Sequence, residues 1–114
     1  MFVPGVIAVR AVHIGLVQKK EIAAAVERAA PTLAPDVVRV QYRFGEDWTG
    51  DSSIYFGIIL SDHAASQEKR LGEIAQRVET TLEDAINVEE LGLQSYFNFR
   101  SQSEQANLKD PNWP

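Results

Sequence analysis

The sequence has 114 residues, of which 45% are hydrophobic and 24% charged, which is typical of a single compact soluble domain. It has no cysteine, which excludes disulfide bonds, thiolate metal sites and cysteine nucleophiles. Its 11 basic and 16 acidic residues give a net charge of −5, which argues against a protein that coats nucleic acid.

The first segment of the chain is nearly apolar from Val3 to Val17, but Arg10 and His13 interrupt it and it is too short for a membrane span. It also lacks the basic start and the cleavage site of a secretory signal, so we expect a cytoplasmic protein. Residues 6–14 are rich in β-branched side chains, which predicts a buried first strand. The alternative is a loosely attached leader.

Two helices are predicted from the spacing of apolar residues. Residues 18–30 are rich in alanine, stop at Pro31 and place three apolar residues on one helical face, namely Ile22, Val26 and Ala29. A long amphipathic helix is predicted over residues 65–87, with apolar positions at steps of three and four: Leu71, Ile74, Ala75, Val78, Leu82, Ala85 and Ile86.

Three later segments alternate between two sets of side chains, as strands do. Residues 37–44 turn one set toward a core (Val38, Val40, Tyr42 and Phe44) and the other away from it (Arg39, Gln41 and Arg43). Residues 54–60 form an antiparallel hairpin with them, with Ile54, Phe56, Ile58 and Leu60 inward and Tyr55, Gly57 and Ile59 outward. Residues 93–100 turn inward Leu93, Ser95, Phe97 and Phe99 and outward Gln94, Tyr96, Asn98 and Arg100.

This order of elements predicts an α+β two-layer sandwich. With the first strand included, it is the βαββαβ order of the ferredoxin-like fold, with two helices on one face of an antiparallel sheet. Residues 1–100 would form this domain and residues 101–114 a polar C-terminal tail. If residues 6–14 are only a leader, a three-stranded α+β sandwich remains, and one sheet face is open in either case.

Charge is divided between the two predicted layers. Residues 68–90 carry seven acidic residues against three basic ones, whereas the three strand segments 37–44, 54–60 and 93–100 carry three arginines and no acid. The predicted open face combines Arg39, Arg43, Arg100, Tyr55, Tyr96, Gln41, Gln94 and Asn98. Such side chains suit an anionic partner, an acidic helix or a single strand of RNA. The alternative is a solvated sheet face with cross-strand pairs.

A connection that is long for a tight hairpin joins the second and third predicted strands and holds Glu46, Asp47 and Asp51 around Trp48. The three carboxylates are candidate ligands of a hard cation such as Mg²⁺, although the spacing is not that of an EF-hand. The alternative is that Asp47 and Asp51 shape the turn, with Gly50 supplying a positive φ and Trp48 folding over the edge of the sheet.

The sequence offers no arrangement of residues for hydrolytic catalysis. The two histidines, His13 and His63, are far apart in the sequence, and we predict that Asp62 caps the long helix. Neither standard glycine-rich phosphate loop occurs. The chain closes with a polar stretch ending in Trp113, which would either dock on its own domain or bind a partner.

Two stretches together, R-F-G-E-D-W-T-G-D at residues 43–51 and Y-F-N-F-R-S-Q-S-E at residues 96–104, resemble those of small uncharacterised bacterial proteins of about this size. The resemblance covers residues 18–114. It implies a protein that accompanies a second small gene product, as toxin and antitoxin components do, and it supplies no catalytic residues.

We therefore expect a cytoplasmic, non-catalytic interaction module that binds another protein or itself, without a cofactor or a membrane. The predicted contact residues are Arg39, Arg43, Tyr55, Tyr96, Asn98, Arg100, Trp48 and Trp113. The alternative is a metal-dependent enzyme or phosphate-ligand-binding protein that uses the acidic loop at residues 45–52. A third hypothesis is weak binding of single-stranded RNA.

Overall fold

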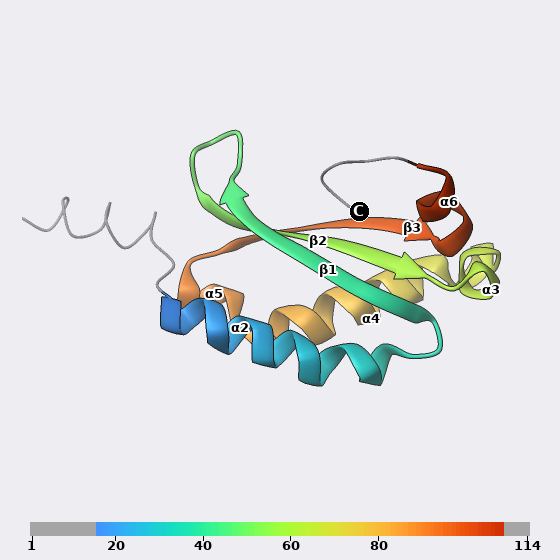
Figure 1. Cartoon of the computed structure of the whole chain (residues 1–114), viewed down its shortest axis with the longest axis horizontal. Helices are drawn as coiled ribbons and strands as arrows, with labels where there is room; N and C mark the ends of the chain where they lie inside the picture. Colours follow the sequence, from blue (N-terminus) through green and yellow to red (C-terminus); the bar gives the residue numbers. More distant parts are fainter. Residues whose placement is uncertain (1–15, 109–114) are drawn as a thin grey trace, which may run out of the picture.

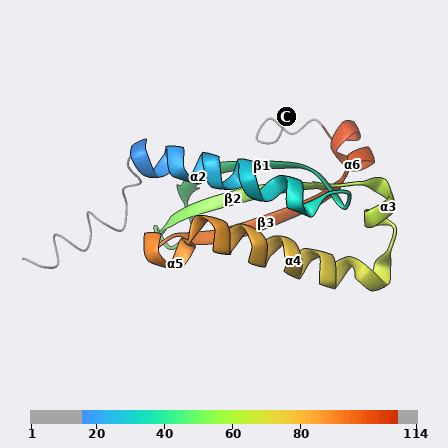
Figure 2. The same cartoon turned by 90° about the horizontal axis from the view of Figure 1, so that it is seen from below.

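The computed structural model of the chain describes residues 16–108, so the strand predicted over residues 6–14, His13 and Trp113 lie outside the described residues. The elements, in chain order, are α2 (Leu16–Ala29), a 3₁₀ helix η1 (Ala30–Leu33), β1 (Val37–Glu46), β2 (Ser52–Leu60), α3 (Asp62–Ala65), α4 (Glu68–Ile86), α5 (Val88–Leu91), β3 (Gln94–Ser101) and α6 (Gln102–Asn107). Helices α2 and α4 lie side by side on one face of the sheet (Figures 1 and 2).

The sheet corrects the predicted topology. Its strand order is β1-β2-β3, with β1 and β2 antiparallel but β2 and β3 parallel, so the sheet is mixed. The described elements run α-β-β-α-β-α rather than βαββαβ. A ferredoxin-like fold would need a strand between β2 and β3, and direct pairing of these two strands closes that position. Because parallel strands need a long crossover, α4 connects them across the face of the sheet.

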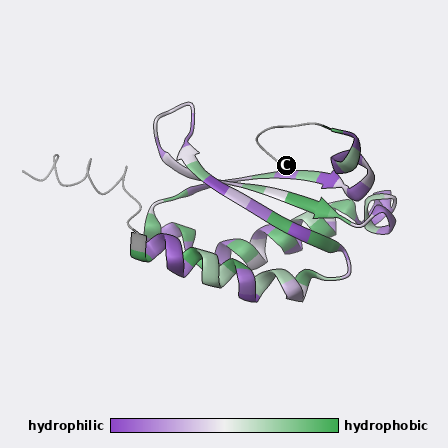
Figure 3. Ribbon diagram, viewed as in Figure 1, coloured by the Kyte–Doolittle hydropathy of each residue, from purple (hydrophilic) through white to green (hydrophobic). Residues whose placement is uncertain are grey.

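The predicted division of the strands into two faces is confirmed by the register. Tyr42, Phe56 and Phe97 lie in one row of the sheet, and Arg43, Tyr55 and Tyr96 lie in the next row. Directly paired residues point to the same face, so the apolar rows meet the helices and the polar rows face away. The hydropathy colouring of Figure 3 shows hydrophobic residues concentrated on β2 and hydrophilic ones along the middle of β1.

Val38 is an exception to the predicted alternation. The pairing between β1 and β2 shifts by one residue between Val37 and Arg39, which places a bulge at the start of β1. Val37 is therefore the buried residue, and Val38 is 47% exposed. A bulge is invisible to an alternation argument because it inserts one residue without changing the residue types around it.

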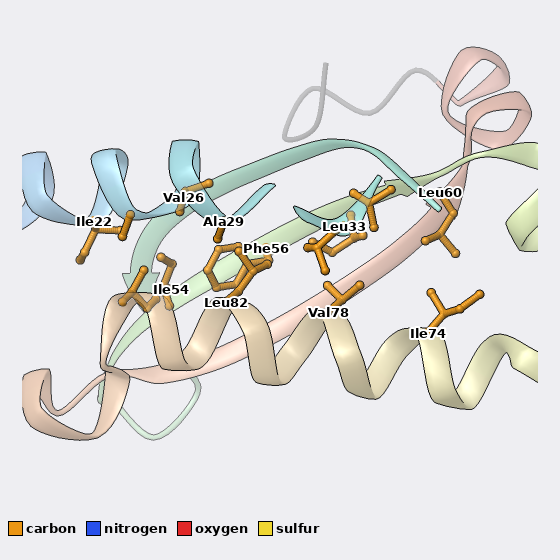
Figure 4. Packing of buried hydrophobic residues seen from close by; sticks show 14 of the residues in the cluster. Ile22, Val26, Ala29, Leu33, Ile54, Phe56, Leu60, Ile74, Val78 and Leu82 are labelled. Carbon is orange, nitrogen blue, oxygen red and sulfur yellow. The ribbon is translucent and has the colours of Figure 1, made fainter. Parts of the chain in front are cut away.

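The core lies between the sheet and the two long helices (Figure 4). It brings together Ile22, Val26 and Ala29 from α2, Leu33 from η1, Ile54, Phe56 and Leu60 from β2, and Ile74, Val78 and Leu82 from α4. All of these side chains are at most 7% exposed. The predicted inner face of the first helix is thus confirmed, with Leu33 added because Pro31 converts the end of the helix into a 3₁₀ turn instead of ending it outright. On α4 the prediction is confirmed for Ile74, Val78, Leu82 and Ile86, but it is wrong for Ala85, which is exposed.

Asp62 does not cap the long helix, contrary to the prediction. Ser61 caps the short helix α3, because its hydroxyl oxygen accepts a hydrogen bond of 3.0 Å from the backbone N–H of Ala64. Helix α4 begins separately at Glu68. The carboxylate of Asp62 accepts hydrogen bonds from the backbone N–H of Ser103 at 3.0 Å and from its hydroxyl at 2.8 Å. These bonds lower the pKa of Asp62. Asp62 therefore fixes the first turn of α6 instead.

Part of the predicted polar tail, Gln102–Asn107, forms helix α6. Ser101 and Glu104 form a capping box that starts α6, and Arg100 donates a hydrogen bond of 3.2 Å to Gln105. None of the residues Gln102–Asn107 is buried, so polar contacts hold this helix against the domain. No helix between residues 16 and 108 is long and apolar enough to cross a membrane.

Candidate interaction surface

The sheet face that α2 and α4 leave uncovered carries the predicted polar rows. The rows, from one end of the face to the other, are Arg39-Ile59-Arg100, Gln41-Gly57-Asn98 and Arg43-Tyr55-Tyr96. Arg39, Arg43 and Asn98 are exposed, and Tyr96 is 37% exposed. Seven of these nine residues, all except Ile59 and Gly57, belong to the set of eight polar and aromatic side chains that the alternation predicted for one face; the eighth is Gln94.

Helix α6 covers one end of this face. Gln105 lies beside Ile59 and Arg100 at this end of the face, and Ile59 is only 5% exposed. Arg100 is half-buried here and bonded to Gln105. The prediction that Arg100 shares a face with Arg39 is confirmed. The Arg100 side chain is half-buried against α6, whereas Arg39 and Arg43 are exposed.

The other end of the face is an aromatic cluster. The rings of Tyr55 and Tyr96 stack with centroids 5.3 Å apart, and the Arg43 guanidinium lies 4.6 Å from the Tyr55 centroid. The Tyr55 hydroxyl donates a hydrogen bond of 2.9 Å to the Glu46 carbonyl. Stacking and cation–π contact hold these side chains in one arrangement. The cluster therefore presents a fixed surface beside the connection between β1 and β2.

Asp47 organises this connection, as the turn-shaping hypothesis expects. Its Oδ1 accepts hydrogen bonds from the backbone N–H of Thr49 at 2.9 Å and of Asp51 at 3.1 Å, and from the Thr49 hydroxyl. Backbone bonds of 2.9 Å also join Asp47 to Asp51 and Gly50 to Asp47. Gly50 has a φ of 88°, which a residue with a side chain adopts only under strain.

The same carboxylate joins the loop to the aromatic cluster. The Tyr96 hydroxyl donates a hydrogen bond of 2.8 Å to Oδ2 of Asp47. The bonds from Thr49, together with those from Tyr96 and Asp51, lower the pKa of Asp47 to about 2. In return, this bond and the negative charge of Asp47 raise the pKa of Tyr96. The loop and the face are thus one hydrogen-bonded unit.

Trp48 protrudes from this unit. It is 91% exposed, the highest exposure among the large hydrophobic residues of the described chain. The prediction that Trp48 folds over the sheet edge is therefore wrong, because the bonds of Asp47 turn the backbone so that the indole points away from the domain.

The acidic residues of the loop do not form a metal centre. Between residues 16 and 108 there is no group of three or more acidic, histidine or cysteine side chains that could hold a metal ion, and this includes Glu46, Asp47 and Asp51. His63 lies on α3, where its Nε2 is 2.6 Å from Nε2 of Gln67, away from the loop.

Two other hollows lie on the helical side of the molecule. One, of about 430 Å³, runs between α2 and the end of α4 and is lined by residues that include Glu21, Arg28 and Glu90. The other, of about 800 Å³, lies beside the start of β3 and is acidic, with Glu83, Asp84 and Glu89. Three acidic residues of the segment 68–90 therefore gather around the second hollow.

Sequence reasoning missed three contacts. It did not predict the bond between Asp47 and Tyr96, the bonds from Ser103 of α6 to Asp62, or the position of Asp36 beside two arginines of α4. Asp36 is buried, and its Oδ2 lies 3.4 Å from Arg70 and 3.7 Å from Arg77. For Asp47 the signal was present locally, since Asp-x-Thr-Gly-Asp suits a side-chain-to-backbone turn; the other two contacts join distant segments.

No protein-family model, curated protein or solved structure matches the chain, so functional inference depends on this geometry.

Proposed function

We propose that the protein is a non-catalytic interaction module that binds another protein through the uncovered sheet face and the adjoining loop. Trp48 carries this proposal, because it is 91% exposed on a connection whose backbone is fixed by hydrogen bonds. A large aromatic side chain on a preorganised loop is a typical anchor of a protein interface, since little conformational entropy is lost when it binds.

The residues beside Trp48 suit the same role. Arg39 and Arg43 are exposed on the sheet face, and Arg43 is held flat against Tyr55. Tryptophan, tyrosine and arginine are the residue types that contribute most to interface affinity. A partner with an apolar pocket for Trp48 and acidic groups opposite the arginines would complement this surface. The resemblance of residues 43–51 and 96–104 to small bacterial proteins implies such a partner, namely a second small gene product that acts together with this protein.

Affinity purification tests the proposal. Tagged wild-type protein, the Trp48→Ala variant and the Val17→Ala variant would be expressed in the cells that the sequence comes from, and the co-purifying proteins quantified. Val17 is a matched control because it is 69% exposed but lies on α2. We expect at least one protein that Val17→Ala retains and Trp48→Ala loses. Equal recovery with all three proteins would contradict a binding role for Trp48.

A further inference from the structure

The outer edge of β1 is open to another strand. Among residues 16–108, β1 pairs with β2 on one side and with no strand on the other. After the bulge at Val38, pairing continues without a shift from Arg39 to Glu46. Every second residue of such an edge strand directs its N–H and C=O groups away from the sheet, where a further strand can bond to them.

The core side of this edge is incompletely covered. Val40, Tyr42 and Phe44 pack against the core but are only half-buried, whereas the β2 residues with which they pair are fully buried. Lys19 of α2 crosses Phe44, with its Nζ 5.6 Å from the ring centroid. A strand with apolar residues on this side would bury the remaining apolar surface of β1, which favours binding.

The opposite side of the same edge is basic. Arg39 and Arg43 are exposed there on either side of Gln41, and β1 has no acidic residue before Glu46. Residues directly opposite each other on paired strands point to the same face. A strand that fits this edge therefore alternates apolar residues, opposite Val40, Tyr42 and Phe44, with acidic residues opposite the arginines.

The edge of β3 does not offer the same features. Its one charged side chain, Arg100, is half-buried and bonded to Gln105, so this edge does not present two exposed arginines on one side. A second copy of the chain is also a poor occupant of the β1 edge, because its own β1 would bring the same two arginines to the same face.

We propose that the outer edge of β1 binds an extended segment of a partner protein, with alternating apolar and acidic residues, as a fourth strand. This inference rests on the proposed function and adds the mode of binding and the chemistry of the partner. The added strand supplies affinity through main-chain hydrogen bonds and specificity through the alternating side chains. Trp48, just beyond the end of β1, provides a separate contact to the body of the partner.

The probe is a fluorescent eight-residue peptide with blocked ends in which valine and glutamate alternate. One control peptide has lysine in place of glutamate, and a second has the same composition in two blocks. We expect binding of the alternating valine-glutamate peptide alone, at least tenfold tighter than either control. Hydrogen exchange should slow at the backbone amides of β1 and remain unchanged in β3.

Charge reversal makes the test specific. The double variant Arg39→Glu/Arg43→Glu should prefer the valine-lysine peptide, whereas Arg28→Glu/Lys69→Glu, with the same net charge but both changes on the exposed surface of α2 and α4, should bind like the wild type. Trp48→Ala should also bind the peptide normally. Suppose that Trp48→Ala loses the cellular partner but the wild-type protein does not bind the peptide. This combination would overturn strand addition and leave the proposed function intact.

Three results would overturn the proposal: no binding of the alternating peptide, equal binding of the acidic and basic peptides, or slower exchange at amides of another strand instead of those of β1. Protection of β1 in the peptide-free protein together with the mass of a dimer would assign the edge to a second copy.

Discussion

Asp47 shows how one side chain can set the form of a surface. Its Oδ1 accepts hydrogen bonds from the backbone N–H groups of Thr49 and Asp51. Its Oδ2 accepts a hydrogen bond from the hydroxyl of Tyr96, on a strand that is distant in the sequence. A carboxylate that accepts several hydrogen bonds favours its charged form. The result is a fixed loop from which Trp48 projects.

Titration of Tyr96 and Asp47 tests this arrangement. We expect the Asp47 carboxyl to titrate at about 2, against an ordinary value of 3.8. Because its pKa is lowered in the folded state, its contribution to stability is present above pH 3.8 and is lost as the pH falls toward 2. Asp47→Asn should lower the raised pKa of Tyr96, while the exposed Asp84→Asn should leave it unchanged. Carbon-detected NMR measures both groups, and an Asp47 midpoint near 3.8 would contradict the observed bonds.

At the residue scale, the sequence predicts which face a side chain occupies better than what it contacts. Alternation placed Arg39, Tyr55 and Asn98 on one face correctly, since the period of a strand is fixed by backbone geometry. It could not predict the exposure of Val38, which depends on a bulge, or the contact of Arg100 with Gln105, which depends on how the chain turns after β3.

Among the elements, α6 is held by the fewest apolar contacts. None of its residues is buried, and Asp62 bonds its first turn through Ser103. We expect Asp62→Ala to speed hydrogen exchange in residues 102–107 while the exchange of α4 stays the same, with Asp84→Ala as the control for loss of one exposed carboxylate. Because the pKa of Asp62 is lowered in the folded state, the stability that the bond contributes is present above pH 3.8 and is lost as the pH falls through this lowered pKa. Unchanged exchange in α6 would show that other contacts hold it.

Helix α4 holds the core together, and its substitution should be costly. Leu82 is fully buried at 0% exposure, so Leu82→Ala should lower the free energy of unfolding by about 2–5 kcal/mol. Val17→Ala, at a residue that is 69% exposed, should change it by less than about 0.5 kcal/mol. Urea denaturation of both variants measures the difference. A similar small effect in both would mean that α4 does not pack on the sheet.

At the element scale, apolar periodicity located both long helices and all three described strands to within a few residues. The short elements were not predictable in the same way. Helices α3, α5 and α6 have 4, 4 and 6 residues, too few for a period to emerge, and they depend on caps and on distant partners such as Ser103 for Asp62.

For the whole molecule, periodicity did not determine which strands are neighbours. The order and direction of β2 and β3 follow from the crossover through α4, and the sequence carries no local mark of that choice. The ferredoxin-like prediction depended on a strand at residues 6–14, outside the described residues, and on its insertion between β2 and β3.

Deletion of residues 1–15 tests whether that strand exists. If residues 6–14 pair with an edge of the sheet, their removal should expose that edge and lower the melting temperature by several degrees. A thermal melt followed by circular dichroism measures the change. An unchanged melt would mean that residues 1–15 contribute no stabilising contact.

We propose that the exposed sheet face serves recognition and not stability. Arg39→Gln/Arg43→Gln removes two exposed charges and should change the free energy of unfolding by only about 0–1 kcal/mol. The most direct measurement is a thermal melt of this variant beside a titration with the partner protein, which is the protein that co-purifies with the wild type but not with Trp48→Ala. We predict a melt close to that of the wild type and an affinity about 30-fold weaker, which corresponds to about 2 kcal/mol. A normal melt with full affinity would contradict the claim.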